Sequence, residues 1–241
     1  MRVGEYPIPL RWFTPVQEVP LCGHATLAAV AIMHQELGCV AVGAIVELTT
    51  ASGPLFVSIR DKDYVLDVPA RRIAPTSMPK TDIEAVLRTR VNEVYESADR
   101  YVCVLDDEEG VCAVAPNMTA LSCLELPGLI VTAPGNDCDF VSRYFAPAKG
   151  VPEDPVTGTS HCTLAPFWSE RLGKTVLRAR QLSARGGQID CAVNRDRVHL
   201  AGACRLYLRG TIVVPAPDAG NDARAPTELS AAAYAVSHKR T

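Results

Sequence analysis

The sequence contains no apolar run that approaches the roughly 20 residues needed to span a bilayer, so we expect no transmembrane helix. The apolar stretch at residues 1–10 is too short for a secretory signal peptide. Lys and Arg (24) do not exceed Asp and Glu (27), and the formal net charge is −3, so nothing indicates a nucleic-acid partner. We therefore expect a cytoplasmic protein that binds neither membranes nor nucleic acids.

Motifs for cofactors are also missing. The nine cysteines are an odd number without Cys-x-x-Cys spacing, which fits reduced thiols better than a disulfide framework or a zinc site. The sequence has neither a glycine-rich phosphate loop nor a dinucleotide-binding fingerprint. These absences predict no metal ion and no organic cofactor. His161 and Cys162 are adjacent, but one such pair cannot chelate zinc alone, and we expect both to face the core from a helix.

The most informative stretch that is present runs from Glu153 to Cys162. Acid, proline and glycine are followed at once by an apolar, helix-permitting run, which predicts a tight loop leading into a helix at Gly158. The first N–H groups of a helix lack intrahelical partners and lie at the positive end of its dipole, so they can hold a carboxylate or phosphate. Gly158 allows close approach to the backbone, and the hydroxyls of Thr159 and Ser160 can add donors.

A second copy of this pattern begins at Gly23. The spacing from Gly23 to Gly38 equals that from Gly158 to Gly173, and a leucine precedes the later glycine in both copies. A glycine at this place suits the left-handed residue that ends a helix. An internal repeat of this length predicts two similar subdomains, each wrapping a sheet around one helix. The strand-like segments that follow the two helices are 45–48 and 55–59 in the first copy, and 175–181 and 188–193 in the second.

These residues resemble the phenazine-biosynthesis-like (PhzF-like) isomerases, which share the fold of diaminopimelate epimerase and proline racemase. The resemblance implies an α+β fold with two pseudo-symmetric domains, each a curled, mostly antiparallel sheet around a central helix. It places the active site in the cleft between the domains and implies a cofactor-independent enzyme that forms a homodimer. The matching stretches run in the family's order between Arg11 and about Val213: 11–15 with 22–26, 139–143, 153–162 and 181–187.

One part of the family's pattern does not occur in this sequence. Family members ordinarily begin with a strand, a helix and another strand, which carry an Asn-Leu-Ser-Glu type motif whose glutamate is the general acid/base. Two explanations stay open: the sequence is an incomplete version of a longer protein, or it is a natural short form that cannot carry out the reaction in the usual way. Without that segment, we expect an exposed apolar edge of the first sheet, which favours dimerisation or aggregation.

The chain is predicted to consist of three parts. Residues 1–75 form a first domain that is incomplete at its amino terminus, and residues 76–214 form a second domain. The tail 215–241 is rich in Ala, Pro, Asp and Asn with almost no aromatic residue, so we expect it to be disordered. Further expected elements are an edge strand over 6–13, a helix over 81–88 capped by Thr81 and Glu84, buried strands over 101–105 and 129–133, a short helix near 118–124, and a long strand pair over 197–213.

By resemblance, His24 contacts the substrate and Asp154 belongs to the active site. The dipole of the first helix is expected to lower the pKa of His24 and keep its imidazole neutral. Pro155 pushes the backbone of Asp154 towards an extended conformation, so its carboxylate either caps the loop or faces the cleft. The structural alternatives remain that His24 merely caps or packs a helix start and that Asp154 is a cap that fixes the loop. The predicted substrate-binding residues are Gly23, Ala25, Gly158, Thr159 and Ser160.

Two other side chains near these turns have chemical potential. Glu153 is the nearest candidate for a replacement base, although a structural or solvent-facing role is the simpler interpretation. Cys22 stands where the related epimerases and racemases place the first of two acid/base thiols. Thr157 occupies the second position, and its hydroxyl is far too weakly acidic to match a thiolate. This mismatch argues against a two-thiol reaction and predicts that Cys22 is a small buried hydrophobe.

The combined prediction is a PhzF-like isomerase that moves a proton between carbons of a small carboxylate. Two helix N-termini would hold the carboxylate and stabilise enolate-like charge, His24 would orient the substrate, and Asp154 would polarise it. Without the family's glutamate, this enzyme is expected either to recruit another base or to be inactive. The alternative is a non-catalytic protein that uses the same scaffold to bind a small carboxylate or a partner.

Overall fold

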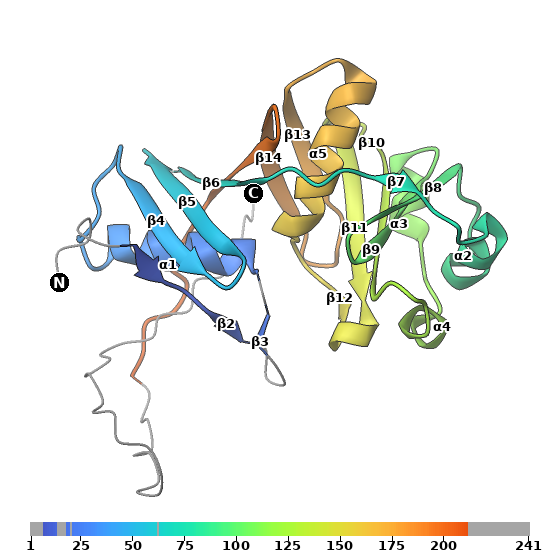
Figure 1. Ribbon diagram of the computed structural model, residues 1–241, viewed down its shortest axis with the longest axis horizontal. Helices are drawn as coiled ribbons and strands as arrows, with labels where there is room; N and C mark the ends of the chain where they lie inside the picture. Colours follow the sequence, from blue (N-terminus) through green and yellow to red (C-terminus); the bar gives the residue numbers. More distant parts are fainter. Residues whose placement is uncertain (1–6, 14–17, 20, 62, 212–241) are drawn as a thin grey trace, which may run out of the picture.

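The computed structural model describes residues 7–13, 18, 19, 21–61 and 63–211, and the predicted tail 215–241 lies outside them. Two lobes lie side by side, one around helix α1 and the other around helix α5 (Figure 1). The helices are α1 (Gly23–Gln35), α2 (Lys80–Leu87), α3 (Glu108–Ala113), α4 (Met118–Ser122), the 3-10 helix η1 (Pro147–Lys149) and α5 (Gly158–Leu172). The strands are β1 (Ile8–Pro9), β2 (Trp12–Phe13), β3 (Glu18–Val19), β4 (Ile45–Thr50), β5 (Gly53–Arg60), β6 (Asp63–Pro69), β7 (Ala74–Pro75), β8 (Glu93–Ser97), β9 (Arg100–Val104), β10 (Gly128–Pro134), β11 (Phe140–Ala146), β12 (Val151–Glu153), β13 (Val176–Gln181), β14 (Gly187–Asn194) and β15 (Arg197–Ala203).

One long sheet connects the two lobes. Its strand order is β1-β4-β5-β6-β15-β14-β13-β11-β10-β9-β8-β7, with β12 added to β11, while β2 and β3 pair separately. Most neighbours are antiparallel, and the parallel pairs are β1 with β4, β9 with β10, and β11 with β13. The edge strand predicted over 6–13 is confirmed in part: among the described residues β1 lies at the sheet edge beside β4, whereas Trp12 and Phe13 belong to the separate β2–β3 pair and residue 6 lies outside the described residues. β15 belongs to the predicted second domain but pairs with β6 of the first, so the boundary between residues 75 and 76 stays a prediction.

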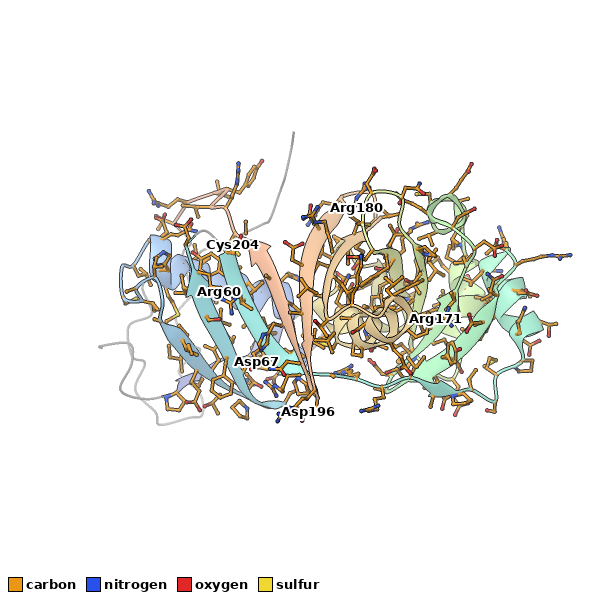
Figure 2. The ribbon with its side chains drawn as sticks, turned by 90° about the horizontal axis from the view of Figure 1, so that it is seen from above. Arg60, Asp67, Arg171, Arg180, Asp196 and Cys204 are labelled. Atoms are coloured by element: carbon orange, nitrogen blue, oxygen red, sulfur yellow. The ribbon has the colours of Figure 1, made fainter. Side chains whose placement is uncertain are left out.

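The predicted repeat is present in the topology. Helix α1 is followed by the antiparallel strands β4, β5 and β6, and α5 by β13, β14 and β15. The two third strands pair with each other, and their register sets Leu66 opposite Leu200. Seen from above, β6 and β15 meet where the lobes join, near the labelled Asp67 and Asp196 (Figure 2). There Arg197 Nε donates to Asp67 Oδ1 at 2.8 Å.

Helices α1 and α5 begin at the two glycines that the sequence singled out. Both are followed by glycines in the left-handed conformation, Gly38 at φ 59° and Gly173 at φ 64°. The N–H groups of Gly173 and Lys174 donate to the Ser169 carbonyl, which satisfies an acceptor at the end of α5. The predicted starts of both helices and the predicted end of α5 are therefore confirmed. The predicted end of α1 is wrong, because α1 ends at Gln35 with Glu36 as its C-cap, and Gly38 lies beyond that cap.

Two hydrophobic clusters hold the strands and helices together. The larger extends through both lobes and includes both tryptophans, Trp12 and Trp168. The smaller lies between the second lobe's strands and helices α2, α3 and α4, with Ile83 and Leu121 at its centre. Strands β9 and β10 are covered on both faces, and every residue of β9 is buried. Such strands have continuous apolar runs rather than alternation, which is why 101–105 and 129–133 were recognisable as buried strands.

Two predictions about secondary structure are wrong. Helix α2 begins at Lys80 with Pro79 as N-cap, so Thr81 lies inside the first turn and cannot cap it; Glu84 instead accepts the Val91 N–H at 3.0 Å. In the described part of the predicted strand pair over 197–213, the extended strand is β15, which pairs with β6 as far as Ala203 opposite Asp63, where β6 begins; residues 212 and 213 lie outside the described residues. No helix of the described residues is long and apolar enough to cross a membrane.

Candidate active site

The N-termini of α1 and α5 meet almost in contact. A Cβ built on Gly23 would lie 3.6 Å from Gly158 Cα, and a Cβ built on Gly158 would lie 3.6 Å from Gly23 Cα. The Cβ on Gly23 would also lie 3.4 Å from Leu66 Cδ2, and the Cβ on Gly158 would lie 3.7 Å from Leu200 Cδ1. The opposed leucines of β6 and β15 therefore support the two helix tips, and the pseudo-symmetry of the fold brings the tips together.

The amides at the two tips differ in availability. The Thr26 N–H makes the first intrahelical bond of α1, to the Cys22 carbonyl at 3.1 Å. In α5 the Ser160 N–H already donates to the Thr157 carbonyl at 3.1 Å. Ser160 can therefore serve a ligand only through its hydroxyl. The amides that have no backbone partner recorded within the described part of the chain are those of Gly23, His24, Ala25, Gly158 and Thr159.

The N-cap residues occupy equivalent places and contact the two candidate proton-transfer groups. Cys22 and Thr157 both have extended backbones, and neither side chain caps its own helix. Cys22 Sγ lies 3.5 Å from His24 Nε2, whereas the Thr157 hydroxyl donates to Asp154 Oδ2. Cys22 packs against the larger core cluster but is only half-buried. The prediction that it is merely a small buried hydrophobe is therefore wrong, because its sulfur contacts the ring of His24.

The predicted lowering of the His24 pKa is wrong as well. The contact with Cys22 raises the pKa of His24, and the negative charge of Asp154 and the Val156 carbonyl act in the same direction. Partial burial of the ring opposes this rise in pKa without cancelling it. The largest cause of the shift is thus a side-chain contact at the start of the helix. His24 therefore carries a proton more often at neutral pH than a free histidine does.

Asp154 is held at the other tip with part of its carboxylate unused. Its N–H donates to the Tyr144 carbonyl at 3.0 Å, which attaches the loop to β11. Burial raises the pKa of Asp154, while the Thr157 hydroxyl and the charges of His24 and Arg100 oppose the rise. The hydroxyl contact fixes the loop, as the structural alternative required, but it uses Oδ2 only. Among the described residues, Oδ1 has no recorded hydrogen-bond partner.

Gln181 is a supporting residue that sequence reasoning missed. It is buried at the end of β13, where its Oε1 accepts the Thr157 N–H at 2.7 Å and its Nε2 donates to the Asp154 carbonyl at 2.6 Å. Gly187 opens the next strand, and a Cβ there would lie 2.4 Å from Val156 Cγ2. The β13–β14 hairpin therefore fixes the loop that presents Asp154. Both residues lie in the matching stretch 181–187, but a glutamine at a strand end gives no local sign of burial.

Arg100 is a second missed residue. It starts β9 and is 3% exposed. Its Nη1 donates to Thr159 Oγ1 and to Ser160 Oγ, both at 3.2 Å. No sequence signal distinguishes it, because Asp99-Arg100 looks like an ordinary solvated turn before a strand.

Glu153 does not fit the role of a replacement base. Arg143 donates to both of its carboxylate oxygens, at 2.7 and 3.0 Å, and also to the Val114 carbonyl at 2.7 Å. These two charge-assisted hydrogen bonds fix the carboxylate in place and occupy both of its oxygens. The simpler structural interpretation of Glu153 is the one that the contacts support.

The buried pair that follows in α5 is not a metal site. His161 and Cys162 are 0% and 2% exposed and face the core, as predicted. His161 Nδ1–H donates to the Thr157 carbonyl at 2.9 Å. Within the described ranges, no group of three or more His, Cys, Asp and Glu side chains is arranged to hold a metal ion. All nine cysteines lie in these ranges, and each is a free thiol.

The two-lobed architecture and the paired helix tips define a protein with the fold of the epimerases. The chain belongs to the family of phenazine biosynthesis-like proteins, whose sequence pattern matches residues 4–215. An uncharacterized isomerase of Pseudomonas aeruginosa is 45% identical over 204 residues, which cover 84% of this chain and 77% of the relative. A PhzF-family phenazine biosynthesis protein of Enterococcus faecalis has a similar structure, with a TM-score of 0.78 at 40% identity over 86% of this chain and 78% of that one. A predicted epimerase of Pseudomonas aeruginosa shares the fold at 18% identity, with a TM-score of 0.67 over 88% of this chain and 82% of that one. These likenesses confirm the predicted family and the α+β, epimerase-like fold.

Proposed function

We propose that this protein is a PhzF-like isomerase that moves a proton between carbons of a small carboxylate bound between the tips of α1 and α5. The observation that carries the proposal is the near contact of Gly23 and Gly158. It brings the first amides of two helices to one place, where the positive ends of both dipoles favour an anion. The isomerase names among the relatives support the same class of reaction.

The proposed reaction is a redox-neutral proton shift. In a substrate with a C3=C4 double bond, a C2–H bond next to the carboxylate breaks and the neutral form of His24 accepts the proton. The electron pair spreads over the double bond and the carboxylate as enolate-like charge. The helix amides stabilise that charge, and Asp154 polarises the substrate from the opposite tip. The proton then returns to a different carbon, so that a C–H bond forms while the double bond moves. This step calls for no metal and no organic cofactor, and both expected absences remain part of the proposal.

The positions of two side chains that can transfer protons support this proposal. His24 follows Gly23 on α1, Asp154 precedes the tip of α5, and each charge influences the pKa of the other group. The raised pKa of His24, caused chiefly by the Cys22 contact, supports a role in proton transfer, because a general acid/base works best when its pKa lies near the working pH. A homodimer in the cytoplasm belongs to the proposal on the family resemblance.

One observation favours a second candidate, a non-catalytic protein that binds small carboxylates on the same scaffold. Glu153 is engaged by Arg143, so Asp154 is the one carboxylate that the described residues leave available beside the tips. A protein that lacks a strong base there keeps the anion site without the chemistry. Binding without turnover is the outcome that this candidate predicts.

Deuterium exchange distinguishes the two candidates. The protein is incubated in deuterium oxide with trans-3-hexenoate, whose C2 protons and double bond report a proton shift by NMR. The isomerase proposal predicts deuterium at C2 or C4 that is lost in His24→Ala and Asp154→Asn and retained in the control His199→Ala, a histidine of β15. Saturable binding of the probe without exchange would favour the carboxylate-binding protein. If the probe neither binds nor exchanges, both candidates are contradicted.

A further inference from the structure

Arg100 is a buried cation that is only partly neutralised. Its Nε and Nη2 donate to Asp99 Oδ1 at 2.9 and 2.8 Å. The same carboxylate also pairs with Lys149 and, at 3.6 Å, with Arg71. A buried ion is costly unless it is paired and its donors are satisfied. Three cations share Asp99, so this group of residues keeps an excess of positive charge behind the α5 tip.

The pKa of Asp99 reflects the positive charge around this carboxylate. Although burial opposes its ionisation, the charges of Arg100 and Lys149 hold the pKa of Asp99 at about 2. The Arg100 guanidinium also lies over the Tyr144 ring, 4.9 Å from its centroid, which fixes its plane. Arg100 is thus held from two sides, and its remaining nitrogen, Nη1, faces the first turn of α5.

The Nη1 contacts determine how the two hydroxyls of that turn can bond. A guanidinium has donors and no acceptor, so Thr159 Oγ1 and Ser160 Oγ must both accept from Arg100. Their hydroxyl hydrogens are then free to be donated elsewhere. No acceptor for either hydrogen is recorded among the residues that the structure describes. Ser160 is 1% exposed, so a ligand at the tip is the acceptor that would satisfy a buried donor.

The α1 tip offers no such donors. In the repeat, His24 and Ala25 correspond to Thr159 and Ser160. The next hydroxyl is that of Thr26. It donates to the Cys22 carbonyl at 2.7 Å, so its hydrogen is not available to a ligand. The two tips are therefore similar in backbone but different in side chains: α5 presents hydroxyl donors backed by a cation, and α1 presents an imidazole beside a thiol.

We propose that Arg100 is a positioning residue that, through Thr159 and Ser160, makes the α5 tip the half of the site that holds the substrate's carboxylate. The reacting carbons then face His24 on α1. This inference rests on the proposed function, because it assigns a direction to the ligand in that site. It predicts a preference for anions over neutral isosteres that depends on Arg100 and on the two hydroxyls.

Binding of acetate and of its neutral isostere acetamide tests this inference. Both are titrated into the full chain and followed by NMR. Wild type is expected to bind acetate in preference to acetamide, with contacts from the acetate methyl group to the His24 ring. Arg100→Gln is expected to weaken acetate binding about tenfold, Arg100→Lys is expected to restore part of the affinity, and acetamide binding should stay unchanged. The matched control is Arg143→Gln, which removes a half-buried arginine from another ion pair and should keep the acetate affinity within twofold.

The possible outcomes separate this inference from the proposed function. Should Arg100→Gln fail to fold, Thr159→Val with Ser160→Ala removes the same hydroxyls without touching the buried cation and is expected to weaken acetate binding. If the folded variants bind acetate as wild type does, the role of Arg100 is overturned while the carboxylate site stands. If acetate binds with its methyl group away from His24, the proposed direction is wrong. If wild type and Arg143→Gln both fail to bind acetate, the proposed function falls and this inference falls with it.

Discussion

Gly23 and Gly158 lie so close that a Cβ on either would touch the backbone of the other, at 3.6 Å. They are separated by most of the chain, yet they occupy the same place in the two halves of the repeat. The register of β6 and β15 sets Leu66 opposite Leu200, and these two side chains pack against the glycines. One pseudo-symmetric arrangement thus explains the repeat in the sequence, the pairing of β6 with β15, and the meeting of two helix N-termini.

The loop that carries Asp154 depends on a glycine outside it. Gly187→Ala would place a Cβ 2.4 Å from Val156 Cγ2, and a β-branched side chain cannot retreat without moving its backbone. We expect a loss of about 1–3 kcal/mol in the free energy of unfolding and weaker acetate binding. The control Gly202→Ala lies in β15 with nothing within 4 Å of the new Cβ. It should leave acetate binding unchanged, and equal effects of the two substitutions would refute this account of the loop.

His161 should make the protein sensitive to acid. Burial lowers the pKa of His161 from 6.5 to about 4, so between these values the unfolded chain binds a proton that the folded protein excludes. Stability must therefore fall as the pH drops through this window, by roughly 3 kcal/mol between pH 7 and pH 4. Denaturant unfolding at a series of pH values should show this slope, and His161→Leu should flatten it.

Two comparisons keep the interpretation of that slope specific. Asp99, with a pKa of about 2, loses its stabilising effect only below its ordinary pKa of 3.8, outside the window. Burial moves the pKa of the Cys191 thiol upward, further from this window, so Cys191→Ala should retain the wild-type slope. A slope that persists in His161→Leu would mean that another group titrates.

The Cys22–His24 contact should be visible in the titration of the histidine. Because Cys22 contributes most to raising the pKa of His24, Cys22→Ala should lower that pKa towards 6.5. NMR titration of the His24 ring protons measures the change directly. The comparable substitution Cys191→Ala removes a buried thiol of β14 and should leave His24 unaffected. An unchanged His24 pKa in Cys22→Ala would show that the thiol does not influence the imidazole.

Much of the fold could be predicted from the sequence because its signals are local. The glycines at the starts of α1 and α5 and at the end of α5, the strands around glycine turns, and the apolar runs of β9 and β10 each follow from a few adjacent residues. The predicted start of α2 was wrong: the helix begins at Lys80 rather than at residue 81, and its N-cap is Pro79 rather than Thr81. The end of β15 depends on where β6 begins, which is a tertiary fact.

The candidate site was predictable only in part, for a similar reason. Its two helix tips follow from local spacing, whereas the residues that support them come from distant strands. Arg100 is about 60 residues from the hydroxyls it contacts, and Gln181 lies 24 residues from Thr157. A lone arginine or glutamine carries no sign of such a partner. The raised pKa of His24 was missed because a side-chain contact, rather than the helix dipole, decides it.

The central claim is that two helix tips share one anion site, and amide NMR tests it most directly. Acetate is titrated into isotope-labelled protein while backbone amide shifts are followed. The amides of Gly23, His24, Ala25, Gly158 and Thr159 should move together and saturate with a single dissociation constant. Shifts confined to one tip, two different dissociation constants, or no movement at either tip would contradict the shared site.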